Sequence, residues 1–265
     1  MLRKLMKYEI KATARIIIPM QLALLIFSII NRLINPFSSL EKANSFNLQV
    51  FINAMSIFIY FALIVGVIAI TLVIVIQRFY KNLLGDEGYL MFTLPVKVNQ
   101  HLLSKLITAV FWMIVSGLSL IFSVLIISCR SGLSTELAEL YKALKNMFGT
   151  TGLIGIGLYI LIALTHGILV IYSSISLGHQ VNNHKIIASF AAFCILYLIT
   201  QIILAILLLL LAWSYGFLEI GAADLQFEPA MLYKILLPVS IVLILLGIGH
   251  FLLNNYVLKH RLNLE

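Results

Sequence analysis

The sequence FINAMSIFIYFALIVGVIAITLVIVI, residues 51–76, runs directly into QRFYKNLLGDEGYLMFTLPVKVNQHLLSK, residues 77–105. The first segment has no charged side chain, and about 20 apolar residues suffice for a helix to cross the ~30 Å hydrocarbon core of a membrane. The second segment is a polar interruption before the next apolar run. In a membrane protein such a segment is expected to make a contact outside the bilayer.

Most of the remaining chain has the composition of a membrane protein. Of its 265 residues, 62% are hydrophobic and only 11% are charged. Lipid offers no hydrogen bonds to the backbone, so apolar runs of this length are expected to be helices. The alternating pattern of outer-membrane strands is absent. The sequence therefore predicts an all-α integral membrane protein with six transmembrane helices, at residues 16–34, 51–76, 106–129, 152–176, 186–212 and 235–255.

Basic residues predict the orientation of these spans. Six spans place both termini on one side, which carries 5 + 4 + 1 + 2 = 12 Lys and Arg, against 6 on the other side. With 4 and 6 acidic residues, the two sides have net charges of 12 − 4 = +8 and 6 − 6 = 0. The positive-inside rule then places both termini in the cytoplasm of a multi-pass protein of the cell membrane. We interpret the charge as a topology signal that also attracts anionic membrane lipids, with no nucleic acid as a partner.

Residues 1–265 are expected to form one transmembrane domain. Residues 1–15 are basic with interleaved apolar side chains, which predicts a short interfacial helix or, alternatively, a plain topogenic leader. No small-residue cleavage site follows the first span, so we expect it to be retained. Residues 131–148 have leucines at helical spacing and are expected to lie as a short helix on the outer surface. Residues 215–232 form the other main outer loop.

The predicted spans contain few side chains that could take part in catalysis or in ion transport. Their interiors contain no Asp, Glu, Lys or Arg, and intramembrane charges persist mainly for function. Their absence argues against coupling to a proton or sodium gradient. His166 lies near a span centre and is interpreted as a packing residue that hydrogen-bonds a neighbouring helix. The chain has no P-loop, and we expect a non-enzyme with no catalytic, cofactor-binding or metal site.

His250 and Asn254 form an H-x-x-x-N pair, one helical turn apart. The pair resembles one motif of the intramembrane CaaX-type proteases. Those enzymes also need adjacent glutamates, and this chain has none. We therefore interpret the pair as structural. Cys129 and Cys194 fall at the end of one span and inside another, so no disulfide framework is expected.

The polar interruption is predicted to contain a short helix. Residues 77–84 continue the second span, and Gly85 ends that helix. Asp86 and Glu87 place negative charge at the start of a new helix, where the helix dipole favours it. Pro95 ends this helix, because the residue before a proline disfavours helical geometry. Its middle, residues 89–92, is more apolar than a solvated loop, which indicates a contact with a protein partner or, alternatively, with the membrane interface.

The segment DEGYLMFTLPV, residues 86–96, with LLSK at 102–105, resembles the first cytoplasmic loop of type-2 ABC exporter permeases. Glu87, Gly88, Leu90, Thr93, Pro95 and Lys105 match that loop by position, whereas Tyr89 replaces a Thr or Ser and Leu94 separates Thr93 from Pro95. The start of the chain, RKLMKYEIKATAR, also resembles permeases common in Gram-positive bacteria. In that family the loop is a coupling helix that docks in a groove of a separate ATPase.

The resemblance implies a transmembrane subunit of an ATP-driven exporter. Its partners would be separate ABC ATPase subunits, which bind ATP and magnesium, and a second permease copy or a paralogue. It implies ATPase coupling by Asp86, Glu87, Gly88, Tyr89, Leu90, Thr93 and Pro95. Scattered polar groups at Gln21, Asn53 and Gln201 suggest a path for an amphipathic, peptide-like or lipid-like cargo. The alternatives are an ion-coupled carrier or channel, and a membrane anchor or sensor that transports nothing.

Overall fold

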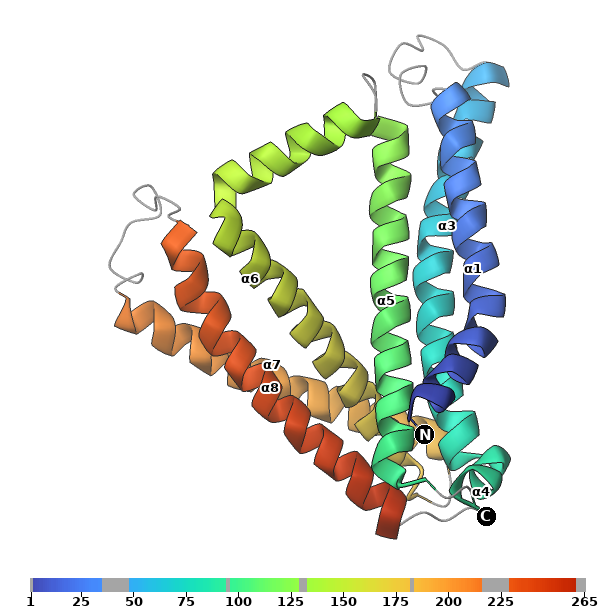
Figure 1. Ribbon diagram of the computed structural model, residues 1–265, viewed down its shortest axis with the longest axis vertical. Coiled ribbons are helices and arrows are strands. Elements are labelled where there is room, and N and C mark those ends of the chain that lie inside the picture. The colour runs from blue at the N-terminus through green and yellow to red at the C-terminus, as the bar shows by residue number, and fades with distance from the viewer. Residues whose placement is uncertain are drawn as a thin grey trace. The chain divides into compact units, whose positions relative to one another are not determined.

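The computed structural model describes residues 2–34, 48–93, 96–128, 133–181, 184–215 and 229–260. Within these ranges the regular structure is entirely helical (Figure 1). Six of the described helices are long and apolar enough to cross a membrane. They span Leu2–Ile34, Leu48–Leu84, Val98–Ser128, Leu137–Gly178, Lys185–Ser214 and Leu232–His260. The predicted class of an all-α, multi-pass membrane protein is confirmed, and every predicted span falls in one of these helices, apart from Cys129, which lies outside the described residues.

The first helix, α1, runs without a break from Leu2 to Ile34. The basic leader is therefore helical, as predicted, but it is continuous with the first span instead of forming a separate short helix. No glycine lies between the leader and the span to end the helix. Pro19 lies inside α1, where its ring removes one backbone hydrogen bond of the helix.

The predicted order of elements around the polar interruption is confirmed. Helix α3 (Leu48–Phe79) continues as a π-helical turn, η1 (Tyr80–Leu84), which was not predicted. The Gly85 N–H donates to the Tyr80 carbonyl at 2.9 Å and closes this wider turn. A short helix, α4 (Asp86–Thr93), follows, and four residues separate its end from the start of α5 (Val98–Ser128). The predicted stop at Pro95 lies outside the described residues.

Helix α6 (Leu133–Gly178) contains one non-helical residue, Gly149, with φ 70° and ψ 167°. A positive φ with an extended ψ is accessible almost only to glycine, so the sequence fixes where the helix changes direction. The short helix predicted up to Phe148 therefore exists and ends at this point, while its location on the outer surface stays a prediction. Helices α7 (Lys185–Ser214) and α8 (Pro229–His260) complete the fold. Between them, residues 216–228 of the predicted outer loop lie outside the described residues.

Packing divides the chain into two compact units. Unit 1 comprises Met1–Val75 and Ile107–Leu140, and unit 2 comprises Ile76–Leu106 and Tyr141–Glu265. The single-domain interpretation stays a prediction. In unit 1, α1, α3 and α5 lie side by side (Figure 1). Two clusters of buried residues hold them together: Ile17 with Ile74 and Trp112, and Leu24 with Tyr60 and Val67.

Candidate functional site: helix α4 and its supports

Helix α4 presents an apolar surface. The side chains of Tyr89 and Leu90 are each 68% exposed. Gly88 is buried, and its N–H donates to the Gly85 carbonyl at 2.8 Å, which fixes the start of the helix against the preceding turn. Thr93 is exposed, and its hydroxyl donates to the Leu90 carbonyl at 2.8 Å. The short helix thus buries its glycine and turns two large side chains outward.

The base of α4 is attached to the ends of longer helices by an aromatic stack. Phe79, the last residue of α3, is fully buried. Its ring stacks on that of Tyr172 in α6, with 4.0 Å between centroids and 10° between planes. The Tyr172 hydroxyl donates to the Lys105 carbonyl in α5 at 3.4 Å. Three helices therefore meet directly beneath the turn that leads into α4.

His179 provides a second attachment. Its Nε2 donates to the Leu84 carbonyl, the last in η1, at 2.7 Å. The Tyr80 ring lies 5.8 Å away, centroid to centroid. Burial and the neighbouring Lys185 both lower the pKa of His179 below its ordinary value, so the imidazole is neutral at pH 7. The sequence does not predict this role, because nothing local pairs His179 with a residue 95 positions away.

Asn82 links the start of α4 to α5. With its amide in the orientation that its neighbours require, its nitrogen donates to the Arg78 carbonyl and to Glu87 Oε2, each at 3.3 Å. Its oxygen accepts from the Lys105 ammonium at 3.0 Å. Asn82 and Lys105 are both buried. A buried ammonium needs polar partners, and the amide satisfies this need while it also connects α4, through Glu87, to α5.

A second contact of Glu87 is more exposed. Its Oε1 lies 3.5 Å from the Lys81 ammonium, and the two side chains are 47% and 72% exposed. Ion pairs of this kind add little stability. The buried amide at Asn82, which sequence reasoning did not single out, is therefore the stronger of the two connections to Glu87. Asp86 is the first residue of α4.

The residues predicted to line a cargo path are not gathered in one unit. Gln21 is buried in unit 1, and its Nε2 donates to Ser116 Oγ in α5 at 3.0 Å. Asn53 is also buried there and accepts from Gln49 Nε2 at 3.2 Å. Gln201 belongs to unit 2 and is exposed on α7. The first two side chains thus have hydrogen-bond partners, and their role in cargo movement stays a prediction.

Other polar side chains join the helices of unit 1 in the same way. Such contacts replace the hydrogen bonds that lipid does not supply. They comprise Trp112 Nε1 to Thr13 Oγ1 at 2.6 Å, Ser56 Oγ to Asn31 Oδ1 at 2.7 Å, Thr71 Oγ1 with Ser116 Oγ at 2.9 Å, and Tyr60 OH with Ser123 Oγ at 3.0 Å.

In unit 2 a polar network joins α6 and α8. His250 Nδ1 lies 3.2 Å from Ser173 Oγ, and Asn254 Nδ2 donates to the same hydroxyl at 2.8 Å. Ser176 Oγ donates to Asn254 Oδ1 at 2.8 Å. The His250–Asn254 pair therefore holds two helices together, in agreement with its structural interpretation.

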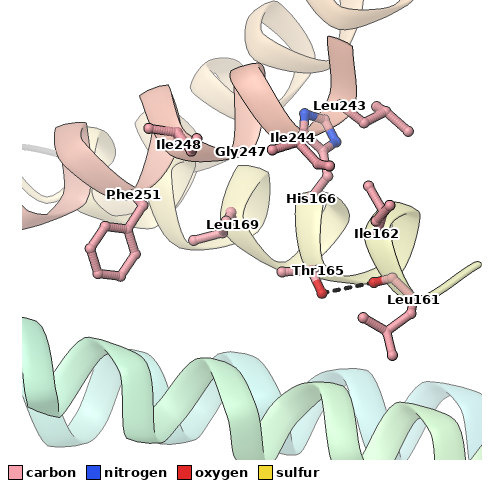
Figure 2. Close-up of a pocket in the computed structure, with 10 residues that line it drawn as sticks. All are labelled: Leu161, Ile162, Thr165, His166, Leu169, Leu243, Ile244, Gly247, Ile248 and Phe251. Carbon is pink, nitrogen blue, oxygen red and sulfur yellow. Dashed lines mark hydrogen bonds between the residues drawn. The ribbon is translucent and has the colours of Figure 1, made fainter. Parts of the chain in front are cut away.

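His166 lies in a cavity between α6 and α8 (Figure 2). Its ring meets the ring of His250 edge-on, 5.6 Å between centroids. The position of His166 near a span centre predicts a hydrogen bond to a neighbouring helix. Among the described residues, its Nε2 is buried without a hydrogen-bond partner, and the structure shows a ring contact with α8 at this residue.

The fold defines a multi-pass α-helical membrane protein. Comparison with protein families, with characterised proteins and with solved structures gives no match for this chain. Its function therefore has to be inferred from its own residues and their geometry.

Proposed function

We propose that the chain is the membrane-spanning subunit of an ATP-driven exporter of the type-2 ABC class. In this proposal it lies in the bacterial cell membrane with both termini in the cytoplasm. It pairs with a second copy or a paralogue and with two separate ATPase subunits that bind ATP and magnesium. The chain itself catalyses no reaction.

One observation supports the proposal above the others: α4 exposes Tyr89 and Leu90 while its base is tied to three long helices. Apolar side chains that are exposed next to each other on a short helix mark a surface that contacts a protein or a membrane. An aromatic and an aliphatic anchor on a short helix suit a groove in a partner protein. The segment also matches the coupling loop of the family by position.

The contacts at the base of α4 would transmit a movement of the ATPases to the membrane spans. Closure of two ATP-bound ATPases would displace α4. Phe79–Tyr172, Asn82–Lys105 and His179–Leu84 would pass this displacement to α3, α5 and α6. Rigid-body movement of packed helices between two discrete arrangements is a common way to alternate access across a membrane. The cargo would be amphipathic, peptide-like or lipid-like.

The test is co-purification with an ATPase that has a P-loop and is encoded beside this chain's gene. The wild-type protein in detergent should retain that ATPase. Leu90→Asp places a charge in the apolar contact and should release it, with export reduced at least tenfold. The matched control is Leu140→Asp, which alters an exposed leucine in the segment predicted to lie on the opposite side. This variant should retain the ATPase.

Two results would contradict the proposal. One is a wild-type protein that inserts in the membrane and never retains the ATPase. The other is Leu90→Asp that retains an active ATPase and exports normally. A loss of ATPase by both leucine variants would show that the effect is not specific to α4 and would also count against docking there.

A further inference from the structure

The first turns of α1, the darkest blue part of Figure 1, carry basic side chains on one side of the helix. Arg3, Lys7, Lys11 and Arg15 are spaced four residues apart, so they follow one another along neighbouring turns. All four are exposed, and so is Lys4 beside them. We call these five residues the basic face. The net charge of the sequence does not say which cations share a surface, and the structure gathers these five on one helix.

The other side of the same turns packs into unit 1. Thr13 is buried, and its hydroxyl accepts from Trp112 Nε1 of α5 at 2.6 Å. Ile10 and Ala14 pack against the first of the two buried clusters. Glu9 is the only acidic residue in α1, and it is buried as well. The basic face therefore has no exposed acidic side chain of its own helix beside it.

The basic face lacks a counter-charge in the described part of the chain. None of its five side chains makes a hydrogen bond or an ion pair with another described residue. Like charges four residues apart on a helix repel each other and destabilise it. Arg3 and Lys4, in the first turn, also oppose the helix dipole. This arrangement favours an external partner with negative charge.

The exposed side of α1 changes from basic to apolar after Arg15. Ile18, Leu22 and Ile26 continue the same line of the helix, and all three are exposed. They belong to a helix that is long and apolar enough to cross a membrane, so their side chains suit the hydrocarbon core. The boundary of that core therefore falls close to Arg15.

Distances from this boundary show which cations can reach a lipid headgroup. At about 1.5 Å per residue, Lys11, Lys7 and Arg3 lie about 6, 12 and 18 Å from Arg15 along the helix. The headgroup layer is about 5–8 Å thick on each side of the core. The charge of anionic lipids acts over a further Debye length of about 10 Å in 0.1 M salt. Lys11 thus lies in the headgroup layer, Lys7 within the field of the lipids and Arg3 at its limit.

We propose that the basic face binds the phosphate headgroups of anionic phospholipids in the membrane that the chain spans. Arg15 and Lys11 contact a headgroup directly, because guanidinium and ammonium groups form charge-assisted hydrogen bonds with phosphate. Lys7 adds attraction through the surface potential. A lipid suits this face better than a soluble anion, because the face continues into an apolar surface that the acyl chains cover. The inference needs no ATPase and no cargo, so it is independent of the proposed transport function.

The experiment uses the full chain in phosphatidylcholine bilayers without a partner protein. One probe is a phosphatidylglycerol with a photoreactive diazirine in its acyl chain near the glycerol, and the comparison probe is a phosphatidylcholine with the same chains. After illumination, mass spectrometry measures the labelling of α1. In 0.1 M salt the wild type should be labelled by the phosphatidylglycerol about tenfold more than by the phosphatidylcholine. This ratio should fall toward one in 1 M salt, where the Debye length is only about 3 Å.

The double variant Lys7→Gln with Lys11→Gln removes two charges near the boundary. Both residues are exposed, and glutamine is also a good helix former, so the fold should be kept. The labelling ratio should fall at least fivefold, as expected from the contribution of a basic residue near an anionic surface. The matched control is Lys142→Gln with Lys145→Gln, which removes two exposed cations from α6. It should leave the ratio at α1 unchanged.

Arg3→Gln with Lys4→Gln tests whether the partner is a membrane. These residues lie furthest from the boundary, so the ratio should fall less than twofold, whereas a soluble polyanion would engage the whole face. Equal labelling of the wild type by both probes, or an equal loss with the α6 control, would overturn the proposal. So would a loss with Arg3→Gln and Lys4→Gln that matches the loss with Lys7→Gln and Lys11→Gln. An acidic protein released by these variants, without a preference for phosphatidylglycerol, would assign the face to that protein and refute lipid binding.

Discussion

His179 and Leu84 are joined by a hydrogen bond of 2.7 Å that fastens the end of the π-helical turn to the end of α6. The donor is the imidazole Nε2, and the Nδ1 is buried without a hydrogen-bond partner among the described residues. The ring is therefore suited to its neutral form. The contact lies just before the helix that we propose to dock with an ATPase, so its loss would loosen the base of that helix.

This contact predicts a loss of stability in mild acid. The pKa of His179 is lowered from its ordinary value of 6.5 by burial, and further by Lys185. Above pH 6.5 the residue is neutral in both the folded and the unfolded chain. As the pH falls below 6.5, the unfolded chain binds a proton and the folded chain does not, so folding becomes less favourable. The melting temperature in detergent should fall by a few degrees between pH 7.5 and pH 5.5.

His179→Gln isolates the contribution of this one histidine. Glutamine can still donate to the Leu84 carbonyl, and it does not titrate. The variant should therefore lose part of the acid sensitivity of the wild type. The prediction is wrong if the wild type and His179→Gln lose the same number of degrees over this pH range.

Asn82 should contribute more to the stability of the protein than the exposed ion pair between Lys81 and Glu87. Asn82→Ala removes the amide that contacts both Glu87 and the buried Lys105. Because these hydrogen bonds join charged partners at a buried site, their loss should lower the free energy of unfolding by about 1–3 kcal/mol. Lys81→Ala breaks only the exposed contact with Glu87. It should lower the free energy of unfolding by less than about 1 kcal/mol. Thermal unfolding of both variants in one detergent compares them, and an equal or larger effect of Lys81→Ala would contradict the ranking.

Gly149 should be intolerant of any side chain. Its φ of 70° with ψ of 167° is strained for L-residues by about 1–3 kcal/mol. Gly149→Ala should therefore destabilise the protein, although open space surrounds the position of the added Cβ. Gly157→Ala is the matched control, since it also meets open space but lies in regular helix. There alanine should be neutral or stabilise the helix by up to about 1 kcal/mol. Equal melting temperatures of the two variants would show that backbone strain at Gly149 is unimportant.

The sequence predicts the elements of this fold better than their contacts. Long apolar runs identify the six spans, and Gly85 with Asp86 and Glu87 marks the start of α4. These are local properties of the chain. The bond between Gln21 and Ser116 joins residues 95 positions apart, and the periodicity of two apolar helices does not say which faces meet. For the same reason Asn82, Tyr172 and His179 were not recognised as supports of α4.

The π-helical turn before Gly85 was not predicted either, for a different reason. Its residues, YKNLL, suit an α-helix locally. The wider turn brings the buried Leu83 and Leu84 against the core and directs the Leu84 carbonyl to His179. Tertiary contacts therefore select the backbone form here, and no residue within the turn signals it.

The predicted orientation can be tested with single cysteines at two exposed tyrosines. Tyr89 in α4 and Tyr141 in the segment before Gly149 are 68% and 54% exposed, so a reagent in water should reach either position from its own side. The 12-to-6 distribution of basic residues places α4 in the cytoplasm and the segment around Tyr141 outside. The two native cysteines, Cys129 and Cys194, are first replaced by serine to remove background labelling. A membrane-impermeant maleimide added to intact cells should then label Tyr141→Cys and spare Tyr89→Cys, and inverted vesicles should show the reverse. Labelling of Tyr89→Cys in intact cells would refute the orientation, and with it the docking of α4 on a cytoplasmic ATPase.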